Sequence, residues 1–307
     1  MSVMRHLLSI TDLSVQEIEG LLSVAEDIEL RPAAYAQRLA GKKLATLFFE
    51  PSTRTRLSFE AAMYELGGHV LGFAGANSSS AAKGESVRDT VRTVACYADI
   101  IAMRHPLEGA PLAAAQVCPV PIINAGDGGH HHPTQTLADL MTLQREKGRL
   151  DHLRMGLCGD LKFGRTVHSL IGALGRYPGV EFILISPAEL RVPASITREL
   201  SQAGVLFREA ESLEAEIGGL DALYMTRVQR ERFFNEEDYV RLKDTYILDA
   251  DKLRLARPDM IVMHPLPRVN EISPEVDADP RACYFKQVRY GKYMRMALML
   301  KLLEEKA

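Results

Sequence analysis

Short apolar runs separated by polar turns recur along the chain. Residues 42–49 (KKLATLFF) contain a continuous apolar run, as expected of a strand covered on both faces, and residues 69–74 (HVLGFA) read as the next strand. Between them, residues 53–66 carry apolar side chains at helical spacing, and Gly67-Gly68 follows as a stop signal. The pattern predicts a strand, a helix and a second strand in succession.

The same alternation continues to the end of the chain. It predicts strands at 99–104, 120–126, 154–160, 180–186, 222–227 and 260–267, and helices at 87–98, 133–147, 164–177 and 290–307. A first helix, capped by Thr11 or Asp12, runs through Leu22 and Ala25. Strands that alternate with helices indicate parallel sheets, with ligands at the carboxyl ends of the strands.

We therefore expect an α/β protein with two parallel-sheet domains, a cleft between them, and two linking helices. The first domain would comprise residues 1–132 plus 289–307, and the second residues 133–288. The helix at 133–147 and the C-terminal helix are the candidate links. The chain of 307 residues is long enough for two domains that each bury a core.

Composition and charge argue against several classes of protein. A formal net charge of -3 argues against general nucleic-acid binding, and no apolar run approaches the roughly 20 residues that span a bilayer. The N-terminal residues lack the pattern of a signal peptide. Four widely spaced cysteines (Cys96, Cys118, Cys158, Cys283) suggest reduced, mostly buried thiols. These features predict a cytoplasmic protein without membrane or nucleic-acid partners.

The segment PSTRT at 51–55 gathers anion-binding groups at one strand-to-helix turn. Ser52, Thr53 and Thr55 offer hydroxyls, Arg54 offers a guanidinium, and the helix N-terminus offers free N–H groups. The alternative is that Ser52 or Thr53 only caps the helix. One hydroxyl is enough for a cap, so we favour a phosphate cradle. The chain lacks the Walker pattern G-x-x-x-x-G-K, which disfavours nucleotide hydrolysis here.

A second group of polar residues follows the next strands. Arg104 ends a predicted buried strand, and His132 and Gln135 flank Pro133 at the start of a helix. Three adjacent histidines (130–132) would allow a metal site, but no nearby Asp, Glu or Cys spacing completes a ligand set. We favour a neutral His132 that donates to a carbonyl oxygen.

The second half of the chain carries its own polar groups at predicted strand ends. Arg165 begins a helix, and Arg227 and Gln229 lie two positions apart after a strand, facing one side if extended. In HPLP (264–267), two prolines remove backbone donors, so the carbonyls of Pro265 and Leu266 could hold an –NH2 group. A rigid turn without ligand contacts is the alternative. The glycines near 159 do not fit the dinucleotide pattern G-x-G-x-x-G.

These groups together suggest direct transfer between two anionic substrates. Separate arginines could bind carboxylates, and no serine or cysteine stands beside a base as a nucleophile. A carboxylate pair suited to glycoside hydrolysis is also lacking. A fixed set of cations without a nucleophile fits that transfer chemistry.

The motifs, in order, resemble the aspartate carbamoyltransferase family of transcarbamylases over essentially the whole chain. STRTR (52–56) and HPTQ (132–135) are typical of transcarbamylases generally, whereas TRVQ (226–229) and HPLPR (264–268) are similar to the aspartate enzymes. An ornithine enzyme would be expected to carry HCLP and an SMG segment. The resemblance implies a cofactor-free transfer from carbamoyl phosphate to L-aspartate, an early committed step of pyrimidine (UMP) biosynthesis.

The resemblance also implies roles for individual residues. Carbamoyl phosphate would be bound by Ser52, Thr53, Arg54, Thr55, Arg104, His132, Gln135, Pro265, Leu266 and Pro267, and L-aspartate by Lys83, Arg165, Arg227 and Gln229. The catalytic groups would be Arg54, Thr55, Arg104 and His132. The turn at Leu266-Pro267 is compatible with a cis peptide bond.

In this family a serine and a lysine from a neighbouring subunit complete each site of a homotrimer. Lys83 matches that lysine, and counting back four residues gives Ser79, with Ser78 and Ser80 as neighbours. Regulatory chains or a dihydroorotase-like partner are further implied possibilities. The alternatives are a transcarbamylase for another amino acid such as ornithine, a non-catalytic paralogue, and, more remotely, a nicotinamide-dependent dehydrogenase.

Overall fold

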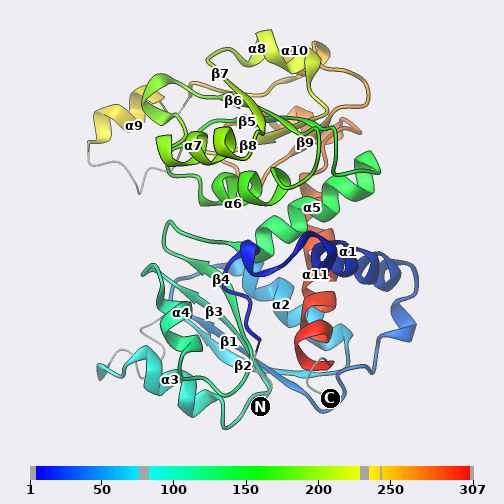
Figure 1. Ribbon diagram of the computed structural model, residues 1–307, viewed down its shortest axis with the longest axis vertical. Helices are drawn as coiled ribbons and strands as arrows, with labels where there is room; N and C mark the ends of the chain where they lie inside the picture. Colours follow the sequence, from blue (N-terminus) through cyan, green and yellow to red (C-terminus); the bar gives the residue numbers. More distant parts are fainter. Residues whose placement is uncertain (1–4, 76–82, 229–234, 243, 305–307) are drawn as a thin grey trace. The chain divides into compact units, whose positions relative to one another are not determined.

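The computed structural model describes residues 5–75, 83–228, 235–242 and 244–304 (Figure 1). The chain forms two compact units, Met1–Ala138 with Val288–Ala307, and Asp139–Gln287. Their boundaries fall within helix α5 (Pro133–Lys147) and helix α11 (Tyr284–Glu304). These two helices therefore connect the units.

The first unit contains a parallel sheet in the order β2-β1-β3-β4. Its strands are β1 (Lys43–Phe48), β2 (His69–Ala74), β3 (Ile100–His105) and β4 (Ile122–Asp127). The chain passes from β1 to β2 in one direction and then adds β3 and β4 on the other side of β1. The direction of winding therefore reverses between β1 and β3, where open α/β sheets place ligands.

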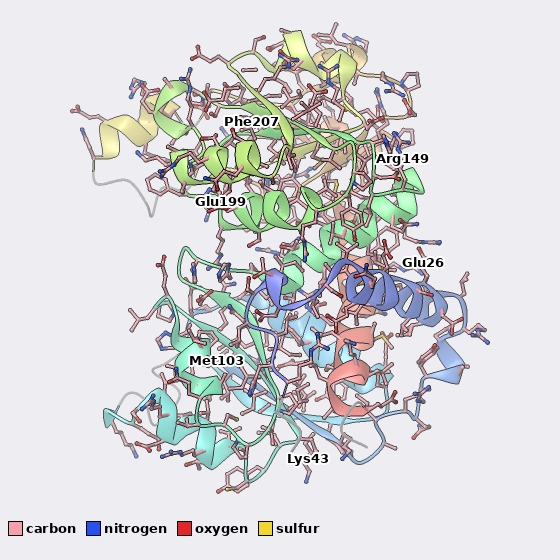
Figure 2. The ribbon with its side chains drawn as sticks, viewed as in Figure 1. Glu26, Lys43, Met103, Arg149, Glu199 and Phe207 are labelled. Atoms are coloured by element: carbon pink, nitrogen blue, oxygen red, sulfur yellow. The ribbon has the colours of Figure 1, made fainter. Side chains whose placement is uncertain are left out.

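Helices cover both faces of this sheet. Side chains of β1 alternate between faces, and Ala45 and Leu47 pack in a core with Val91 of α3 (Val87–Val94) and Ala114 of α4 (Ala110–Ala115). On the opposite face, the Thr46 hydroxyl donates to Glu60 of α2 (Thr53–Glu65). In Figure 2, Met103 lies within β3, where it is fully buried, and Lys43 lies at the exposed start of β1.

The last helix packs against α2. The guanidinium of Arg295 lies 5.1 Å from the centre of the Phe59 ring, and Lys292 Nζ is 2.6 Å from Glu65 Oε1. Near its end, Arg38 pairs with Glu304 at 2.7 Å. These contacts place the C-terminal part of α11 in the first unit, where its side chains from Tyr293 to Leu300 are all buried and not only those of one face.

The second unit repeats the architecture with the order β7-β6-β5-β8-β9. Its strands are β5 (Arg154–Cys158), β6 (Glu181–Ile185), β7 (Leu206–Ala210), β8 (Ala222–Met225) and β9 (Ile261–Met263). Here the winding reverses between β5 and β8. The paired strands are parallel in both sheets, so the predicted fold class of two parallel-sheet α/β domains is confirmed.

The remaining helices surround these sheets. They are α1 (Val15–Leu30), α6 (Arg165–Leu174), α7 (Ala194–Gln202), α8 (Leu213–Glu216), α9 (Glu236–Leu242) and α10 (Ala250–Arg254), with short 3-10 turns Ile10–Asp12, Pro32–Ala34, Ala188–Leu190, Ile217–Gly219 and Pro274–Ala278. No helix in the described ranges is both long and apolar enough to cross a bilayer.

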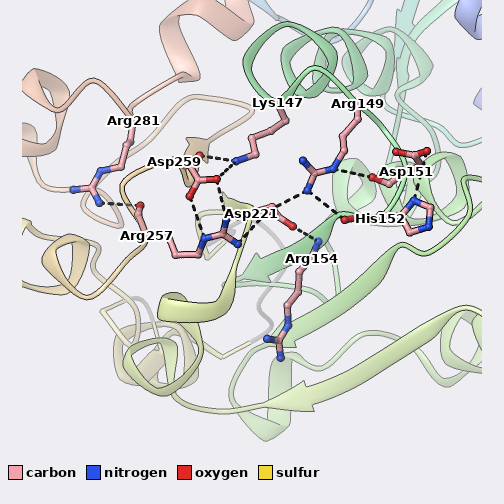
Figure 3. Close-up of polar contacts among 9 residues, drawn as sticks. All are labelled: Lys147, Arg149, Asp151, His152, Arg154, Asp221, Arg257, Asp259 and Arg281. Atoms are coloured by element: carbon pink, nitrogen blue, oxygen red, sulfur yellow. Dashed lines mark hydrogen bonds and ion pairs between the residues drawn. The ribbon is translucent and has the colours of Figure 1, made fainter.

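Hydrogen bonds and ion pairs between charged residues connect the amino ends of strands in the second unit (Figure 3). Asp221, just before β8, accepts a hydrogen bond from the backbone N–H of Arg154 at 2.9 Å and lies 3.3 Å from Arg257. Asp259, before β9, pairs with Lys147 at 3.0 Å. The opposite charges of these groups are paired with one another. They lie at the amino end of the sheet, whereas parallel α/β sheets bind ligands at the carboxyl end.

The structure contains elements that were not predicted, namely strand β7 and helices α7, α8, α9 and α10, and it differs in these further details. The first α-helix is capped by Ser14, whose hydroxyl accepts from Glu17 N–H, and not by Thr11 or Asp12, which lie in a separate 3-10 turn. Helix α4 was not expected, because all the residues of its short sequence APLAAA are apolar and no alternation with polar positions reveals a helical period. Helix α11 begins at Tyr284, ahead of the predicted 290.

The cysteines are free thiols, as predicted. Cys118, Cys158 and Cys283 are buried, and Cys96 is exposed. Cys158 lies in strand β5, where burial raises its thiol pKa far above the ordinary range. Burial likewise raises the pKa of Cys283 to about 12. Both thiols therefore stay protonated and serve as packing groups.

Candidate functional site

The turn between β1 and α2 carries the candidate phosphate cradle. Ser52 is the N-cap residue of α2, with an extended backbone, and its side chain makes no capping hydrogen bond. The first turn of the helix contains no acidic residue; Thr53 and Arg54 are exposed and Thr55 is buried. The alternative in which Ser52 caps the helix is therefore not seen. A helix N-terminus of this kind favours an anion.

Arg104 stands beside that turn at the reversal point of the first sheet. The register pairs Arg104 of β3 with Phe48 at the end of β1, and the Arg104 carbonyl accepts from Phe49 N–H at 2.9 Å. Its side chain is only 11% exposed, and Nη2 lies 2.7 Å from Glu50 Oε2. Burial lowers the pKa of Arg104, whereas Glu50 raises it. The structure thus brings Arg104 next to the Ser52–Thr55 turn.

His132 and Gln135 lie where β4 gives way to α5. His132 is buried, and its carbonyl accepts the backbone N–H groups of Gln135 at 3.0 Å and Thr136 at 3.2 Å. Gln135 is half-buried in the first turn of α5. The carboxyl ends of β1, β3 and β4 therefore lead into all the predicted residues of the first unit except Ser79 and Lys83, which follow β2 in the sequence.

The other histidines of the HHH segment belong to a polar loop. The rings of His130 and His131 have their centres 3.6 Å apart and are tilted by 39° to each other, and His130 Nδ1 lies 3.4 Å from Asp127 Oδ2. Burial lowers the pKa of His131, and His130 lowers it further. Among the residues that the structure describes, no group of three or more His, Cys, Asp or Glu could hold a metal ion.

In the second unit, Arg165 begins helix α6 after a tightly held loop. Gly159 has φ +119°, and a Cβ there would meet the Thr226 carbonyl oxygen at 2.3 Å, so only glycine fits. Asp160 accepts from Phe163 N–H at 3.0 Å. His168 Nε2 lies 2.7 Å from the Leu161 carbonyl oxygen, to which it donates. These bonds fix the chain that leads into Arg165.

Arg227 follows β8 on the other side of the second reversal point. Its neighbour Thr226 is buried; the Thr226 N–H donates to the Cys158 carbonyl at 2.8 Å, and the hydroxyl accepts from Asp160 N–H at 3.1 Å. Hydrogen bonds therefore connect the loop after β5 with the loop after β8. The predicted cation Arg165 lies at the end of the loop after β5, and Arg227 lies in the loop after β8.

The HPLP segment follows β9, next to β8 in the same sheet. Pro265 and Leu266 are half-buried and Pro267 is exposed. The Leu266-Pro267 peptide bond is cis, and Leu266 has φ +55°. The Leu266 N–H donates to His264 Nδ1 at 2.8 Å. The segment is a rigid turn, as one alternative held, and its carbonyls also lie at the carboxyl edge of the sheet.

Among the residues expected from a neighbouring subunit, Lys83 lies within the described ranges. Lys83 is exposed and lies just before α3. Ser78, Ser79 and Ser80 lie outside the described residues, and so does Gln229.

Three carboxylates in or near these groups were not predicted. Glu50 pairs with Arg104, Asp160 holds the loop before Arg165, and Glu271 lies 2.7 Å from His264. Glu50 could have been suspected, because it begins the turn that carries the cradle. Glu271 gives no signal in sequence, because a lone glutamate in a polar segment is usually solvated.

Comparison with known proteins identifies the family. Residues 5–145 match the family model "Aspartate/ornithine carbamoyltransferase, carbamoyl-P binding domain", and residues 151–302 match "Aspartate/ornithine carbamoyltransferase, Asp/Orn binding domain". The chain is 62% identical over 301 residues to the aspartate carbamoyltransferase catalytic subunit of Lachnoclostridium phytofermentans, covering 98% of both chains.

Solved structures agree with this match. The catalytic subunit of M. jannaschii aspartate transcarbamoylase superposes with a TM-score of 0.92 at 48% identity, over 98% of this chain and 99% of that one. The Trypanosoma cruzi aspartate transcarbamoylase, in complex with carbamoyl aspartate and phosphate, gives 0.88 at 40% identity, over 97% and 95%. The chain therefore belongs to the aspartate/ornithine carbamoyltransferase family and, within it, resembles the aspartate carbamoyltransferase catalytic subunits.

Proposed function

We propose that this chain is the catalytic subunit of an aspartate carbamoyltransferase, which transfers the carbamoyl group of carbamoyl phosphate to L-aspartate. The product would be N-carbamoyl-L-aspartate, a precursor for pyrimidine (UMP) synthesis. The observation that carries the proposal is that cationic groups flank the winding reversal of each sheet. Arg54 and Arg104 flank the reversal of the first sheet, and Arg165 and Arg227 that of the second.

The first group suits carbamoyl phosphate. Ser52, Thr53, Arg54 and Thr55 would bind the phosphate through hydroxyls, a guanidinium and helix N–H groups. Arg104, His132 and Thr55 would polarise the carbamoyl oxygen. Gln135 and the carbonyls of Pro265 and Leu266 would hold the carbamoyl –NH2, with Pro267 fixing that turn. Ligand names of the Trypanosoma cruzi structures, which include carbamoyl phosphate and aspartate, support this substrate pair.

The second group suits a dicarboxylic amino acid. Arg165 and Arg227 would bind the two carboxylates, because a guanidinium can grip both oxygens of a carboxylate. Gln229 would assist, together with Ser79 and Lys83 of a neighbouring subunit. An ornithine enzyme would instead need to accommodate a cationic side chain, for which two arginines are unfavourable.

The reaction needs only these groups. The uncharged α-amine of aspartate attacks the carbamoyl carbon and forms the C–N bond, while the oxyanion is stabilised by Arg104, His132 and Thr55. The bond between the carbamoyl carbon and the phosphate oxygen then breaks. The phosphate leaves with that electron pair and takes up the proton that the amine loses.

A homotrimer in the cytoplasm, with sites completed by a neighbouring chain, belongs to the same proposal. The free thiols of the cysteines agree with a reducing compartment. Gel filtration with light scattering would test the trimer.

Steady-state kinetics of the purified chain test the function. We expect phosphate release that depends on L-aspartate and is blocked by the bisubstrate mimic N-phosphonacetyl-L-aspartate. Release that requires L-ornithine instead, or that the mimic leaves unaffected, would refute the proposal.

A further inference from the structure

The turn at 264–267 is built so that it presents hydrogen-bond acceptors and no donors. Pro265 and Pro267 have no N–H group, and the N–H of Leu266 donates to His264 Nδ1 at 2.8 Å. The carbonyl oxygens of Pro265 and Leu266 remain as the polar backbone atoms of the turn. A surface of this kind suits an amide –NH2, which is a donor at both hydrogens.

His264 can perform this function only in one tautomer. Because Nδ1 accepts the Leu266 N–H, the proton of the neutral ring must lie on Nε2. Nε2 lies 2.7 Å from Glu271 Oε1, and both side chains are buried, with 1% and 5% exposed. Burial lowers the pKa of His264, which keeps the ring neutral. Glu271 is therefore the acceptor for the Nε2 proton.

Glu271 is itself held as a carboxylate. Its second oxygen, Oε2, accepts the backbone N–H groups of Val269 at 3.0 Å and Asn270 at 3.1 Å. Burial raises the pKa of Glu271, but the hydrogen bonds from His264 and the backbone outweigh burial and leave it below the ordinary value. The backbone N–H of His264 is fixed as well, by Gln287 Oε1 at 3.0 Å. His264 is thus held by three hydrogen bonds, two on its imidazole and one on its backbone.

A second His-Pro-Leu turn shows which part of this arrangement is local. In the first unit, His105 Nδ1 accepts the Leu107 N–H at 3.0 Å, after strand β3. The sequence His-Pro-Leu therefore places the third residue's N–H on the imidazole in both units. The buried carboxylate on Nε2 distinguishes His264, where Leu266 also adopts a positive φ that leucine rarely takes without support.

We propose that Glu271 and His264 are positioning residues, which bind the Leu266 N–H and so aim the Pro265 and Leu266 carbonyls at the –NH2 group of carbamoyl phosphate. The proposal rests on the proposed function. Its consequence is selective, because the pair should affect ligands that carry the amide and spare ligands that carry only the phosphate.

The variant Glu271→Gln tests the pair. Both oxygens of Glu271 face donors, so the –NH2 of glutamine must oppose one of them in either orientation. Two stable probes separate the effects: phosphonoacetamide, which has the amide, and inorganic phosphate, which lacks it. We expect the variant to weaken phosphonoacetamide binding about tenfold in calorimetry. Phosphate binding should stay within about twofold.

Glu275→Gln is the matched control, because Glu275 is an exposed glutamate of the same unit. It should leave both affinities unchanged. Equal weakening of both probes by Glu271→Gln, or no weakening of either, would overturn the proposal. Should Glu271→Gln fail to fold, His264→Asn and His264→Gln replace it. Asparagine can still accept the Leu266 N–H through Oδ1, whereas the longer glutamine does not place an oxygen there.

We therefore expect His264→Asn to bind phosphonoacetamide more tightly than His264→Gln does, and the opposite order or equal affinities would overturn the proposal. The wild-type protein separates this failure from failure of the function. If it forms N-carbamoyl-aspartate while Glu271→Gln and Glu275→Gln bind phosphonoacetamide equally, only the positioning role is lost.

Discussion

Arg104 and Glu50 form an ion pair at 2.7 Å beside the turn that carries the candidate phosphate cradle. Arg104 Nη1 also donates to the Ala125 carbonyl at 3.4 Å, so two nitrogens of one guanidinium are engaged. A lysine has a single nitrogen and cannot make both contacts in this geometry. The pair holds the guanidinium in one orientation next to the helix N-terminus.

Arg104→Lys should therefore lower turnover by about 100-fold, the typical cost of losing one oxyanion donor. Initial rates at saturating substrates measure the effect. The control is Arg38→Lys, because Arg38 pairs with Glu304 on an exposed surface, and its turnover should be normal. Turnover of Arg104→Lys above half the wild-type value would contradict the proposed role.

Sharing of sites between subunits predicts complementation. Arg54→Ala should inactivate the chain's own site, whereas Lys83→Ala should inactivate the site of a neighbour. Trimers assembled at random from equal amounts of the two inactive chains should regain about a quarter of the wild-type sites. The activity after mixing and reassembly measures this fraction, and each variant reassembled alone is the control. Mixtures that stay inactive would mean that Lys83 acts in its own chain, and full activity of Lys83→Ala alone would mean that Lys83 has no role in the site.

Acid stability should depend on Glu17 in the first helix. The hydrogen bond from Arg5 lowers the pKa of Glu17 from 4.5 to about 2. Because the folded-state pKa is depressed, its stabilisation is present above about pH 4.5 and disappears as the pH falls toward 2. Glu17→Gln should cost about 1 kcal/mol at pH 6, after allowance for solvent screening, and almost nothing at pH 2.

Urea denaturation at a series of pH values measures this difference. The exposed Glu19 in the same helix provides the control, and Glu19→Gln should change the free energy of unfolding little at either pH. A cost for Glu17→Gln that is independent of pH would contradict the account.

The buried network around Asp139 should stabilise the second unit. Tyr224, fully buried in β8, donates to Asp139 Oδ2 at 3.1 Å, and Gln287 donates to Oδ1 at 2.6 Å. Tyr224→Phe removes one donor from a buried carboxylate and should lower the free energy of unfolding by about 2 kcal/mol. Urea denaturation measures it, with the exposed Tyr64→Phe as a control expected to lie within about 0.5 kcal/mol of wild type. Equal effects of the two variants would refute the role of the network.

Much of the fold could be predicted because buried parallel strands such as β1 and β6 are continuous apolar runs. The edge strand at 69–74, which has no buried residue, and the helix at 133–147 were predicted with the observed bounds. Helix α4 was missed because its alanines give no amphipathic period. The cap of the first helix was misplaced because Thr11 and Asp12 also suit a cap, but they form a separate 3-10 turn just before Ser14, which makes the capping hydrogen bond.

The candidate site likewise contains residues that could be predicted from the sequence and residues that could not. Groups adjacent in sequence, such as Ser52–Thr55, could be recognised from local chemistry. The pairing of Arg104 with Glu50 depends on β1 and β3 lying side by side, which local patterns do not encode. The role of Glu271 could not be predicted for a related reason, because Glu271 contacts its partner His264 only after the chain has turned back.

Product analysis in a competition assay tests the central claim most directly. The purified chain would receive carbamoyl phosphate with equal amounts of L-aspartate and L-ornithine, and mass spectrometry would identify the carbamoylated product. The account predicts N-carbamoyl-aspartate with an equimolar amount of phosphate, and a rate at least about 100-fold lower for Arg54→Ala. N-carbamoyl-ornithine as the main product, or an undiminished rate in Arg54→Ala, would contradict it.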